Sequence, residues 1–427
     1  LIITYYWPPS GGAGVQRCLK FVKYLPENNV MPFVVTVDEE KATYPVKDSS
    51  LGKEVPSDVK VYRTNTKEPF NIYRKLLGKG DVPFAGFTNE SNPSLVQNLS
   101  RFIRGNFFIP DARKGWNHFA YQKCVELIEK EGIDTILTSS PPHSTQLIGL
   151  KLKKKCGVRW IADIRDPWTD IYYYDKMKHT ELAKRLDRQY EKQVLENADR
   201  VIVVSDDIKR LFSEKLDKSI GGKITVIPNG FDQNDFKISD SKIGEEFTIS
   251  YTGTVTEDYN AEVFFKGMQE LVKRFPDVNY KIKFVGGINA GYQDQIEQYG
   301  ISSNLEVVPY VPHSEAINCL LESTALLLVI PDVINNKGIL TGKLFEYLGS
   351  RKPIVCIGPK DGDAARIINE CNAGSIFEQN DLSKLVGYLA ELTEQWLKNG
   401  EIVLDGEEYL SYTRQHQTKL LAAMINE

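Results

Sequence analysis

The sequence lacks the features that mark several classes of protein. None of its apolar runs reaches the roughly 20 residues of a membrane-spanning helix. Its six cysteines show neither C-x-x-C pairs nor metal-binding spacing, so we expect reduced thiols in a cytoplasmic protein. The absence of a Gly-x-Gly-x-x-Gly loop argues against a nicotinamide-dependent oxidoreductase. No nucleic-acid-binding motif is present, and the basic residues are too dispersed to indicate one.

The composition is that of an ordinary globular protein, with an uneven distribution of charge. The chain has 427 residues, 26% charged and 41% hydrophobic, which is enough for two or more domains. The net charge is -4, yet residues 1–228 carry 36 basic and 28 acidic side chains, whereas residues 229–427 carry 17 and 29. The basic first half predicts a polyanionic partner, such as an anionic membrane surface. Two unrelated surfaces that differ by drift would give the same numbers.

Strands and helices alternate along both halves of the chain. Residues 1–228 begin with an apolar strand, a glycine-rich loop, a helix and a second strand, and the alternation resumes after residue 134. The polar stretch 229–246 is predicted to be a linker, and a second α/β series occupies 247–406. A closing helix is expected at 407–425. Such alternation predicts two parallel sheets, each covered by helices on both faces.

Loops that follow predicted strands in the first half carry candidate binding residues. The first is the loop Pro8–Gly14, whose glycines allow a backbone to approach a ligand closely. His143 comes after the predicted strand Thr135–Thr138, and the charged run Asp163–Trp168 begins at the end of the next strand. Because parallel strands end at one edge of a sheet, we expect these residues to lie near one another. Turn formation and helix capping are the alternatives.

Two segments of the first half mix apolar residues with arginine and lysine. They are residues 69–77 and residues 99–110, and a basic helix tip follows at Lys153–Lys155. Aromatic and aliphatic residues interleaved with basic ones suit an interface with anionic lipid headgroups. Amphipathic helices packed on the domain would give the same pattern.

The stretch Gly338–Leu348 is the most informative part of the second half. It lies between two apolar runs, so a short helix is predicted to start near Thr341 after a strand. The free N–H groups of a helix N-terminus attract phosphate, and Lys343 in the first turn adds a positive charge. Glu346 follows on the same face and suits ribose hydroxyls. A solvated ion pair between Lys343 and Glu346 is the alternative.

Three motifs together resemble those of the family 4 glycosyltransferases, over essentially the whole chain. They are the Pro-Pro-x-Gly-Gly-x-Gly loop at Pro8–Gly14, the turn Ile227–Asp232 and the run Gly342–Leu348. The resemblance implies the GT-B fold, an α/β architecture of two tandem Rossmann-like domains that face a cleft. It implies that the N-terminal domain binds the acceptor, that the C-terminal domain binds a nucleotide-diphosphate sugar, and that the closing helix packs back on the first domain.

The resemblance also implies the reaction and its setting. Transfer of a hexosyl-type group would proceed with retention of configuration, to a glycan or lipid-linked acceptor of the cell envelope, with no cofactor. A cytoplasmic location follows, with the inner face of the cell membrane as a docking surface. We see no convincing Asp-x-Asp metal motif, and the nearest acidic group, Asp163, Asp166 and Asp170, is assigned no metal and no general base. The leaving phosphate would take the acceptor's proton.

Site residues are carried over by position. Glu346 matches the glutamate that holds the ribose, and Lys343 and the amides near Gly342 would face the diphosphate. His143 matches a histidine near the reacting sugar, so His143, Lys343 and Glu346 are the predicted catalytic residues. The other predicted donor-binding residues are Gly12, Gly253, Thr254, Val311, Thr341 and Gly342. The acceptor side is predicted to include Gly11, Arg165, Asp166 and Trp168 besides His143.

Two departures from the family pattern leave alternatives open. The first glutamate of the family's Glu-x7-Glu motif would fall at position 338, where this chain has Gly338. No basic residue follows the Gly253 turn, where the family often has one. A nucleotide-sugar 2-epimerase of the same fold would act on the nucleotide-sugar alone, without an acceptor. A non-catalytic protein would bind a sugar nucleotide without turnover.

Overall fold

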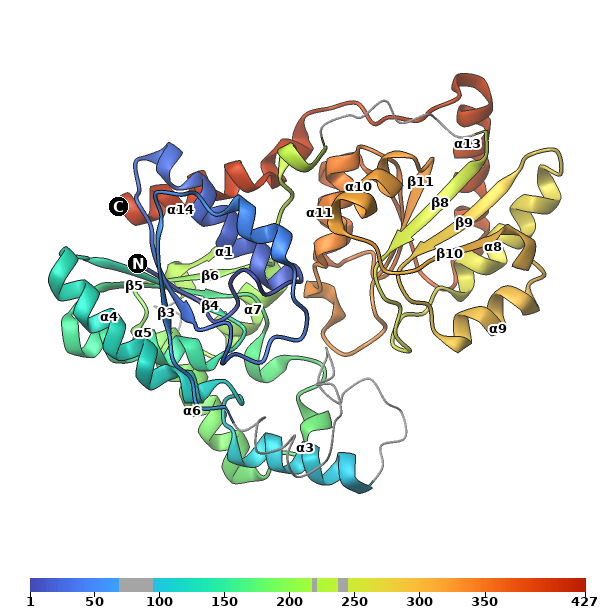
Figure 1. Cartoon of the computed structure of the whole chain (residues 1–427). Helices are drawn as coiled ribbons and strands as arrows, with labels where there is room; N and C mark the ends of the chain where they lie inside the picture. Colours follow the sequence, from blue (N-terminus) through green and yellow to red (C-terminus); the bar gives the residue numbers. More distant parts are fainter. Residues whose placement is uncertain (69–94, 217–220, 237–244) are drawn as a thin grey trace. The chain divides into compact units, whose positions relative to one another are not determined.

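The structure, a computed structural model, divides into two compact units. It describes residues 1–68, 95–216, 221–236 and 245–427. One unit consists of Leu1–Pro228 with Arg414–Glu427, and the other of Asn229–Thr413. Each unit contains one parallel sheet with helices on both faces (Figure 1). None of the helices within these ranges is both long and apolar enough to cross a bilayer.

The first unit is built on a seven-stranded sheet. Its strands are β1 (Ile2–Ile3), β2 (Phe33–Val37), β3 (Lys60–Thr64), β4 (Thr135–Ser140), β5 (Arg159–Ile164), β6 (Arg200–Val203) and β7 (Ile224–Val226). They are ordered β3-β2-β1-β4-β5-β6-β7, with every neighbouring pair parallel. The order reverses direction between β1 and β4, and ligands bind beyond the carboxyl ends of the strands at such a switch point.

The described helices of the first unit connect these strands and cover both faces of the sheet (Figure 1). They are α1 (Ala13–Tyr24), α3 (Leu95–Phe107), α4 (Asn117–Glu131), α5 (Ser144–Cys156), α6 (Glu181–Asn197), α7 (Asp206–Glu214) and α14 (Arg414–Asn426). Helix α14 is the last helix of the chain, and it packs on α1. The Arg159 guanidinium donates a 2.8 Å hydrogen bond to the Ile425 carbonyl near its end.

The second unit has a six-stranded sheet with the same reversal. Its strands are β8 (Phe247–Thr252), β9 (Tyr280–Val285), β10 (Leu305–Val308), β11 (Ala325–Val329), β12 (Ile354–Ile357) and β13 (Gly374–Phe377). They are ordered β10-β9-β8-β11-β12-β13, all parallel. The helices are α8 (Glu262–Arg274), α9 (Ala290–Gln298), α10 (His313–Leu321), α11 (Gly342–Ser350), α12 (Asp363–Glu370) and α13 (Leu382–Asn399). The switch point lies between β8 and β11.

Both faces of each sheet are buried, as the alternation of side chains along the strands shows. On β11, Leu327 packs in one hydrophobic cluster of the second unit, and its neighbours Leu326 and Leu328 pack in another. On β5, Trp160 and Ile161 divide in the same way between two clusters of the first unit. Neighbouring residues of a strand point to opposite faces, so apolar runs of this kind identify strands covered on both sides.

The described part of the stretch 229–246 folds onto the second unit. A short 3₁₀ turn covers Gln233–Phe236. A Cβ atom at Gly349 of α11 would lie 2.7 Å from Phe231 and 2.6 Å from Phe236, so these rings pack directly on the helix backbone. Phe231 and Phe236 therefore pack with the second unit, within the stretch for which the sequence predicts a linker.

A buried ion pair joins α1 to the end of β5 in the first unit. Arg17 Nη2 lies 2.8 Å from Asp163 Oδ1, and neither side chain is exposed. The other contacts complete the pair: Asp163 Oδ2 accepts a hydrogen bond from Ser139 Oγ at 2.7 Å. Arg17 donates to the carbonyls of Ile227 and Pro228 at 2.9 and 2.8 Å. The Arg17 guanidinium thus connects α1 and the end of β5 to residues 227 and 228, the last of this unit before the chain enters the second one.

We expect the substitution Asp163→Asn to destabilise the first unit strongly. It leaves the Arg17 guanidinium buried without a counterion, which costs about 3–5 kcal/mol. Urea unfolding followed by tryptophan fluorescence measures this loss in the first unit, because four of the five tryptophans lie there. Arg210→Gln, which breaks exposed pairs on α7, is the control and should change stability by less than about 1 kcal/mol. Equal stability of Asp163→Asn and the control would refute this account.

Candidate functional site

Two glycine turns meet at the carboxyl edge of the second sheet. Strand β8 ends in Gly253, whose φ is 98° and whose N–H donates to the Val285 carbonyl at 2.7 Å. Strand β9 ends in Gly286, whose φ is 128°. A Cβ atom at Gly286 would lie 2.6 Å from the Gly253 carbonyl oxygen, so no larger residue fits there. Backbone groups therefore form this surface, which lets a ligand approach the main chain closely.

Helix α11 is held at the switch point by Tyr347. The Tyr347 hydroxyl accepts a hydrogen bond from the Thr252 N–H at 3.1 Å and donates one to the Leu327 carbonyl at 3.2 Å. It thereby joins α11 to both β8 and β11. The N-terminus of α11, with its free N–H groups, is thus fixed beside the Gly253 turn. This is an arrangement that binds anions.

Lys343 lies against the Gly253 turn, beside two tyrosine rings. A Cβ atom at Gly253 would lie 2.8 Å from Lys343 Cε and 3.1 Å from Nζ. Its ammonium is 5.1 Å from the centroid of the Tyr251 ring and 5.9 Å from that of Tyr259. It forms no ion pair with any residue that the structure describes. Burial lowers the pKa of Lys343, and the carboxylate of Glu346 opposes this effect.

Two hydroxyl groups at the same edge are also unsatisfied. Thr341 stands at the N-cap position of α11, but its side chain does not cap the helix, and its Oγ1 is buried without a hydrogen-bond partner. Thr252 Oγ1, at the end of β8, is in the same situation. Buried polar atoms are normally paired, so both hydroxyls are available to a ligand. The sequence analysis included Thr341 but not Thr252, which is a β-strand residue without a distinguishing motif.

Glu346 belongs to a separate polar group one turn further along α11. Its Oε1 lies 3.8 Å from His313 Nδ1, and His313 Nε2 lies 3.5 Å from Asp235 Oδ2. His313 begins α10 directly after the loop of Val311, and Tyr310 in that loop is 79% exposed. The loop Tyr310–His313 is expected from the sequence to border the base, whereas Asp235 is not expected at the site. Asp235 lies in the stretch interpreted as a linker, so nothing in the sequence placed it beside α11.

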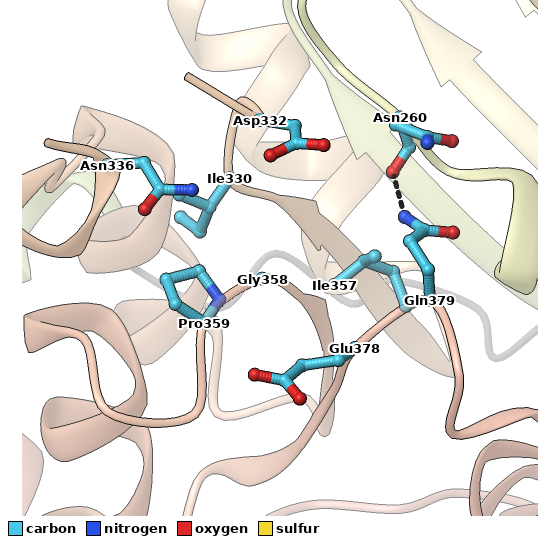
Figure 2. A pocket seen from close by; sticks show the side chains of 9 residues that line it. All are labelled: Asn260, Ile330, Asp332, Asn336, Ile357, Gly358, Pro359, Glu378 and Gln379. Carbon is cyan, nitrogen blue, oxygen red and sulfur yellow. Dashed lines mark hydrogen bonds between the residues drawn. The ribbon is translucent and has the colours of Figure 1, made fainter. Parts of the chain in front are cut away.

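A small polar pocket lies on the other side of the loop that leads to α11. Figure 2 shows its lining residues, Asn260, Ile330, Asp332, Asn336, Ile357, Gly358, Pro359, Glu378 and Gln379. Gln379 Nε2 donates to the Asn260 carbonyl at 3.0 Å, and the pocket holds about 190 Å³. That volume is below the roughly 300–1,000 Å³ of sites for whole ligands. The pocket lies beside the loop of Gly338 and is too small for a whole nucleotide. A nucleotide would instead bind at the carboxyl edge of the sheet, near Gly253 and α11.

In the first unit, Arg165 connects two loops at the carboxyl edge of the sheet. Its guanidinium donates to the carbonyls of Gly14 at 2.9 Å, Ser140 at 2.9 Å and Pro141 at 3.3 Å. Gly12, with a φ of 89°, directly precedes α1 in the first loop. These hydrogen bonds occupy the side chain with the protein's own backbone. Arg165 therefore orients the glycine loop and the loop before His143.

His143 is stacked on Trp168. The ring centroids are 4.6 Å apart, with an interplanar angle of 15°, and the buried Nδ1 has no hydrogen-bond partner. Burial lowers the pKa of His143 to about 3, and the charge of Arg165 acts in the same direction. The imidazole is therefore neutral near pH 7. Trp168 has a φ of 35°, unusual for a bulky residue, and its Nε1 donates to Asp187 Oδ1 at 2.8 Å.

The remaining residues predicted from the sequence lie near these groups. Gly11 N donates to the Val46 carbonyl at 2.9 Å, in the first loop. Burial raises the pKa of Asp166, which follows Arg165. Thr254 comes directly after Gly253, and its Cγ2 would be 3.6 Å from a Cβ at Gly287. The structure thus places the predicted residues at the carboxyl edges of the two sheets, each within its own unit.

The described residues contain no group of three or more histidine, cysteine, aspartate or glutamate side chains that could hold a metal ion. The Asp-x-Asp sequence Asp361-Gly362-Asp363 has both carboxylates paired with basic side chains. Asp361 pairs with Lys337, and Asp363 lies 3.2 Å from Arg366.

The comparisons with known proteins match both units. The family model described as Glycosyltransferase Family 4 matches residues 80–235, and that described as Glycosyl transferases group 1 matches residues 232–405. None of the curated proteins matches the chain.

Solved structures share the whole fold at low sequence identity. HepE of Anabaena in complex with UDP has a TM-score of 0.57 at 12% identity, over 99% of this chain and 94% of that one. The E. coli trehalose-6-phosphate protein bound with UDP-2-fluoro glucose has 0.59 at 13%, over 100% and 99%. WaaG, a glycosyltransferase involved in lipopolysaccharide biosynthesis, has 0.54 at 12%, over 99% of both. The chain therefore belongs to the glycosyltransferases of GT-B fold, with a family 4 domain followed by a group 1 domain.

Proposed function

We propose that this glycosyltransferase moves a hexosyl group from a nucleotide-diphosphate sugar to a glycan or lipid-linked acceptor of the cell envelope, with retention of configuration. The observation that carries the proposal is the unpaired ammonium of Lys343 at the N-terminus of α11, beside the Gly253 turn. HepE binds UDP and UDP-glucose, and WaaG acts in lipopolysaccharide biosynthesis. These functions support a nucleotide-sugar donor and an envelope acceptor.

The diphosphate is the part of the donor that this edge suits best. When the bond between sugar C1 and the phosphate oxygen breaks, its electron pair stays on the diphosphate. Lys343, the N–H groups of α11 and the hydroxyls of Thr252 and Thr341 would stabilise the growing negative charge. Groups held in place before the reaction stabilise a developing charge most effectively. As the acceptor oxygen bonds to C1, its proton passes to the leaving phosphate, so no protein base is required.

Glu346 and His313 would bind the nucleoside of the donor. A carboxylate accepts hydrogen bonds from the two ribose hydroxyls, and Glu346 is partly exposed for this purpose. The exposed ring of Tyr310, in the loop before α10, is available to the base. His143 and Gly12 lie in the first unit, and we propose that His143 contacts the reacting sugar and that Gly12 approaches the donor's phosphates. Because His143 is neutral near pH 7, it would act through hydrogen bonds rather than as an acid.

Gly338 supports one competing function. The family glutamate that touches the donor sugar is absent at this position, and no basic residue follows Gly253. A sugar-nucleotide-binding protein without turnover would have these features. Donor consumption that depends on an acceptor distinguishes the transferase from this protein, and also from an epimerase, which needs no acceptor.

We expect Lys343→Met to weaken the binding of a nucleoside diphosphate by about 10- to 100-fold, because a charge-assisted contact with phosphate is lost. Glu346→Gln should weaken nucleoside binding through the ribose. Isothermal titration with UDP, GDP, ADP and dTDP measures both effects and identifies the base. Lys337→Met, which removes an exposed lysine paired with Asp361, is the matched control. Wild-type affinity and turnover in both site variants would contradict the proposed site.

We expect turnover to be independent of divalent metal ions, because Lys343 and the α11 N-terminus supply the positive charge. Donor consumption by the purified protein should be the same with EDTA and with added Mn²⁺. Activity that rises with Mn²⁺ and disappears with chelator would show that a metal takes part.

The membrane contact is proposed for the basic first unit. Of the basic helix tip, Lys153 is paired with Asp199 at 2.7 Å, whereas Lys154 and Lys155 are exposed. Of the two mixed segments, residues 69–77 lie outside the described residues. The other forms most of α3, where Phe102, Ile103 and Phe107 are exposed.

Reversing Lys154 and Lys155 to glutamate should weaken binding to vesicles of phosphatidylcholine and phosphatidylglycerol by about tenfold or more, since each basic residue contributes about 1 kcal/mol. Lys398→Glu, an exposed change on α13, is the control. Co-sedimentation at two salt concentrations gives the readout. If both variants bind the vesicles equally well, the basic helix tip does not contribute to membrane binding.

A further inference from the structure

Helix α3 exposes apolar side chains and hides a basic one. Phe102, Ile103 and Phe107 are 40%, 38% and 67% exposed, whereas Arg101 is only 5% exposed. An amphipathic helix on a protein surface normally has the opposite arrangement, with charged residues in water. Arg104 lies three residues beyond Arg101, which places both on one side of the helix. Their side of the helix faces the protein, whereas apolar side chains of the same helix face the solvent.

Neither arginine has a partner for its charge among the described residues 1–68, 95–216, 221–236 and 245–427. Arg101 Nε and Nη2 are buried without a hydrogen-bond acceptor. Within the part of the chain that the structure describes, neither Arg101 nor Arg104 forms an ion pair. Burial lowers the pKa of Arg104, and the positive charge of Arg113 lowers it further. A buried charge without a counterion is costly, so the buried Arg101, with the partly buried Arg104 one turn away, points to an anion that binds there.

The contacts of α3 prevent the arginines from turning outward. A side chain at Gly105 would collide with the Met177 carbonyl, so the helix backbone lies directly on that segment. Asn106 Nδ2 donates to the Lys178 carbonyl at 3.0 Å, and Asn106 Oδ1 accepts from the Thr180 N–H at 2.7 Å. These contacts fix the rotation of the helix about its axis. The inward direction of Arg101 and Arg104 is thus built into the fold.

The surroundings of Arg104 belong to the carboxyl edge of the first sheet. Tyr6, Asp111, Arg113 and Tyr173 are the groups whose charges act on it. Tyr6 follows β1 at the switch point, and Tyr173 is close enough to Asp166 for that carboxylate to raise its pKa. Arg104 therefore faces the side of the first unit on which the acceptor is predicted to bind, and Arg101 lies one turn away on the same helix.

The nearby charged groups already have partners. Asp111 accepts hydrogen bonds from Ser144 N at 2.7 Å, from Ser144 Oγ at 2.8 Å and from the Arg113 N–H at 2.8 Å. Arg113 lies 2.8 Å from Glu68. Among the residues that the structure describes, no carboxylate forms an ion pair with Arg101 or Arg104, so both guanidinium groups can bind a ligand.

We propose that Arg101 and Arg104 bind a phosphoryl group of the acceptor. The inference rests on the proposed function and names the acceptor class, a phosphorylated sugar or a glycan carried on a phosphate-containing lipid. A phosphate monoester or a diphosphate carries about two negative charges and balances both guanidinium groups, whereas the carboxylate of an acidic sugar balances only one. The planar guanidinium fork matches phosphate oxygens. The hydroxyls of Tyr6 and Tyr173 are further donors nearby.

The test separates this phosphate site from that of the donor. In the Lys343→Met variant, the donor's phosphate site is weakened, so inorganic phosphate should bind mainly at α3. Adding Arg101→Met and Arg104→Met should weaken this binding by about tenfold or more, as measured by isothermal titration at constant ionic strength. Arg210→Gln, which removes one exposed positive charge on α7, should leave it unchanged. Phosphate affinity that survives the two arginine substitutions overturns the proposal.

Stability and nucleotide binding give independent readouts. Without ligand, Arg101→Met and Arg104→Met should unfold at the same or a higher urea concentration than wild type, because the charges they remove are unpaired. A large loss of stability would assign the arginines a structural role and overturn the proposal. The binding of UDP to these variants should equal that of wild type. If UDP binding fails to respond to Lys343→Met, the donor site is refuted while the phosphate site at α3 stands.

The source of the phosphoryl group needs two probes. Glucose 1-phosphate presents it on a soluble sugar, and vesicles of phosphatidylcholine with phosphatidic acid present it on a lipid. We expect at least one probe to bind wild type and to lose binding with Arg101→Met and Arg104→Met. The probe that does so identifies the class of acceptor. If neither probe binds wild type, the proposal is wrong.

Discussion

The ion pair between Arg17 and Asp163 organises the carboxyl edge of the first sheet. It is fully buried, so its strength depends on complete hydrogen bonding, which Ser139 and the carbonyls at the end of the unit supply. Arg17 follows the glycine loop, and Asp163 precedes Arg165, which holds that loop in turn. The positions of the loop, of the segment before His143 and of the chain's exit thus depend on one another.

Elsewhere the chain keeps positive charges unpaired where a ligand is expected. The donor edge has Lys343, with Thr252 and Thr341 as unsatisfied hydroxyls, and α3 has Arg101 and Arg104. These side chains differ from Arg17, which has a buried carboxylate as its partner. A paired buried charge holds elements together, whereas an unpaired one lowers the stability of the free protein and is compensated when an anion binds. Sites of this kind trade some stability for affinity.

Sequence reasoning succeeded where the cause is local. The helix predicted to start near Thr341 begins at Gly342 with Thr341 at its N-cap position, because the signals for this start lie within the segment itself. The role of Lys343 at a diphosphate stays a prediction, made because a lysine in the first turn of a helix that follows a strand can meet a phosphate. Asp235 and the inward direction of Arg101 could not be predicted, because distant parts of the chain determine them. The rotation of α3 depends on contacts with residues 177–180, far along the chain.

The two places where the chain passes between its units are bound to each other. The Phe231 N–H donates to the Tyr412 carbonyl at 3.2 Å, so the outgoing and returning strands form a short parallel bridge. Phe231 also packs on Gly349 of α11, and Arg17 holds the Pro228 carbonyl on the other side of the junction. The start and the end of the second unit are therefore bound to each other beside α11. The helix that carries Lys343 thus packs against a segment that is held by residues from both ends of its unit.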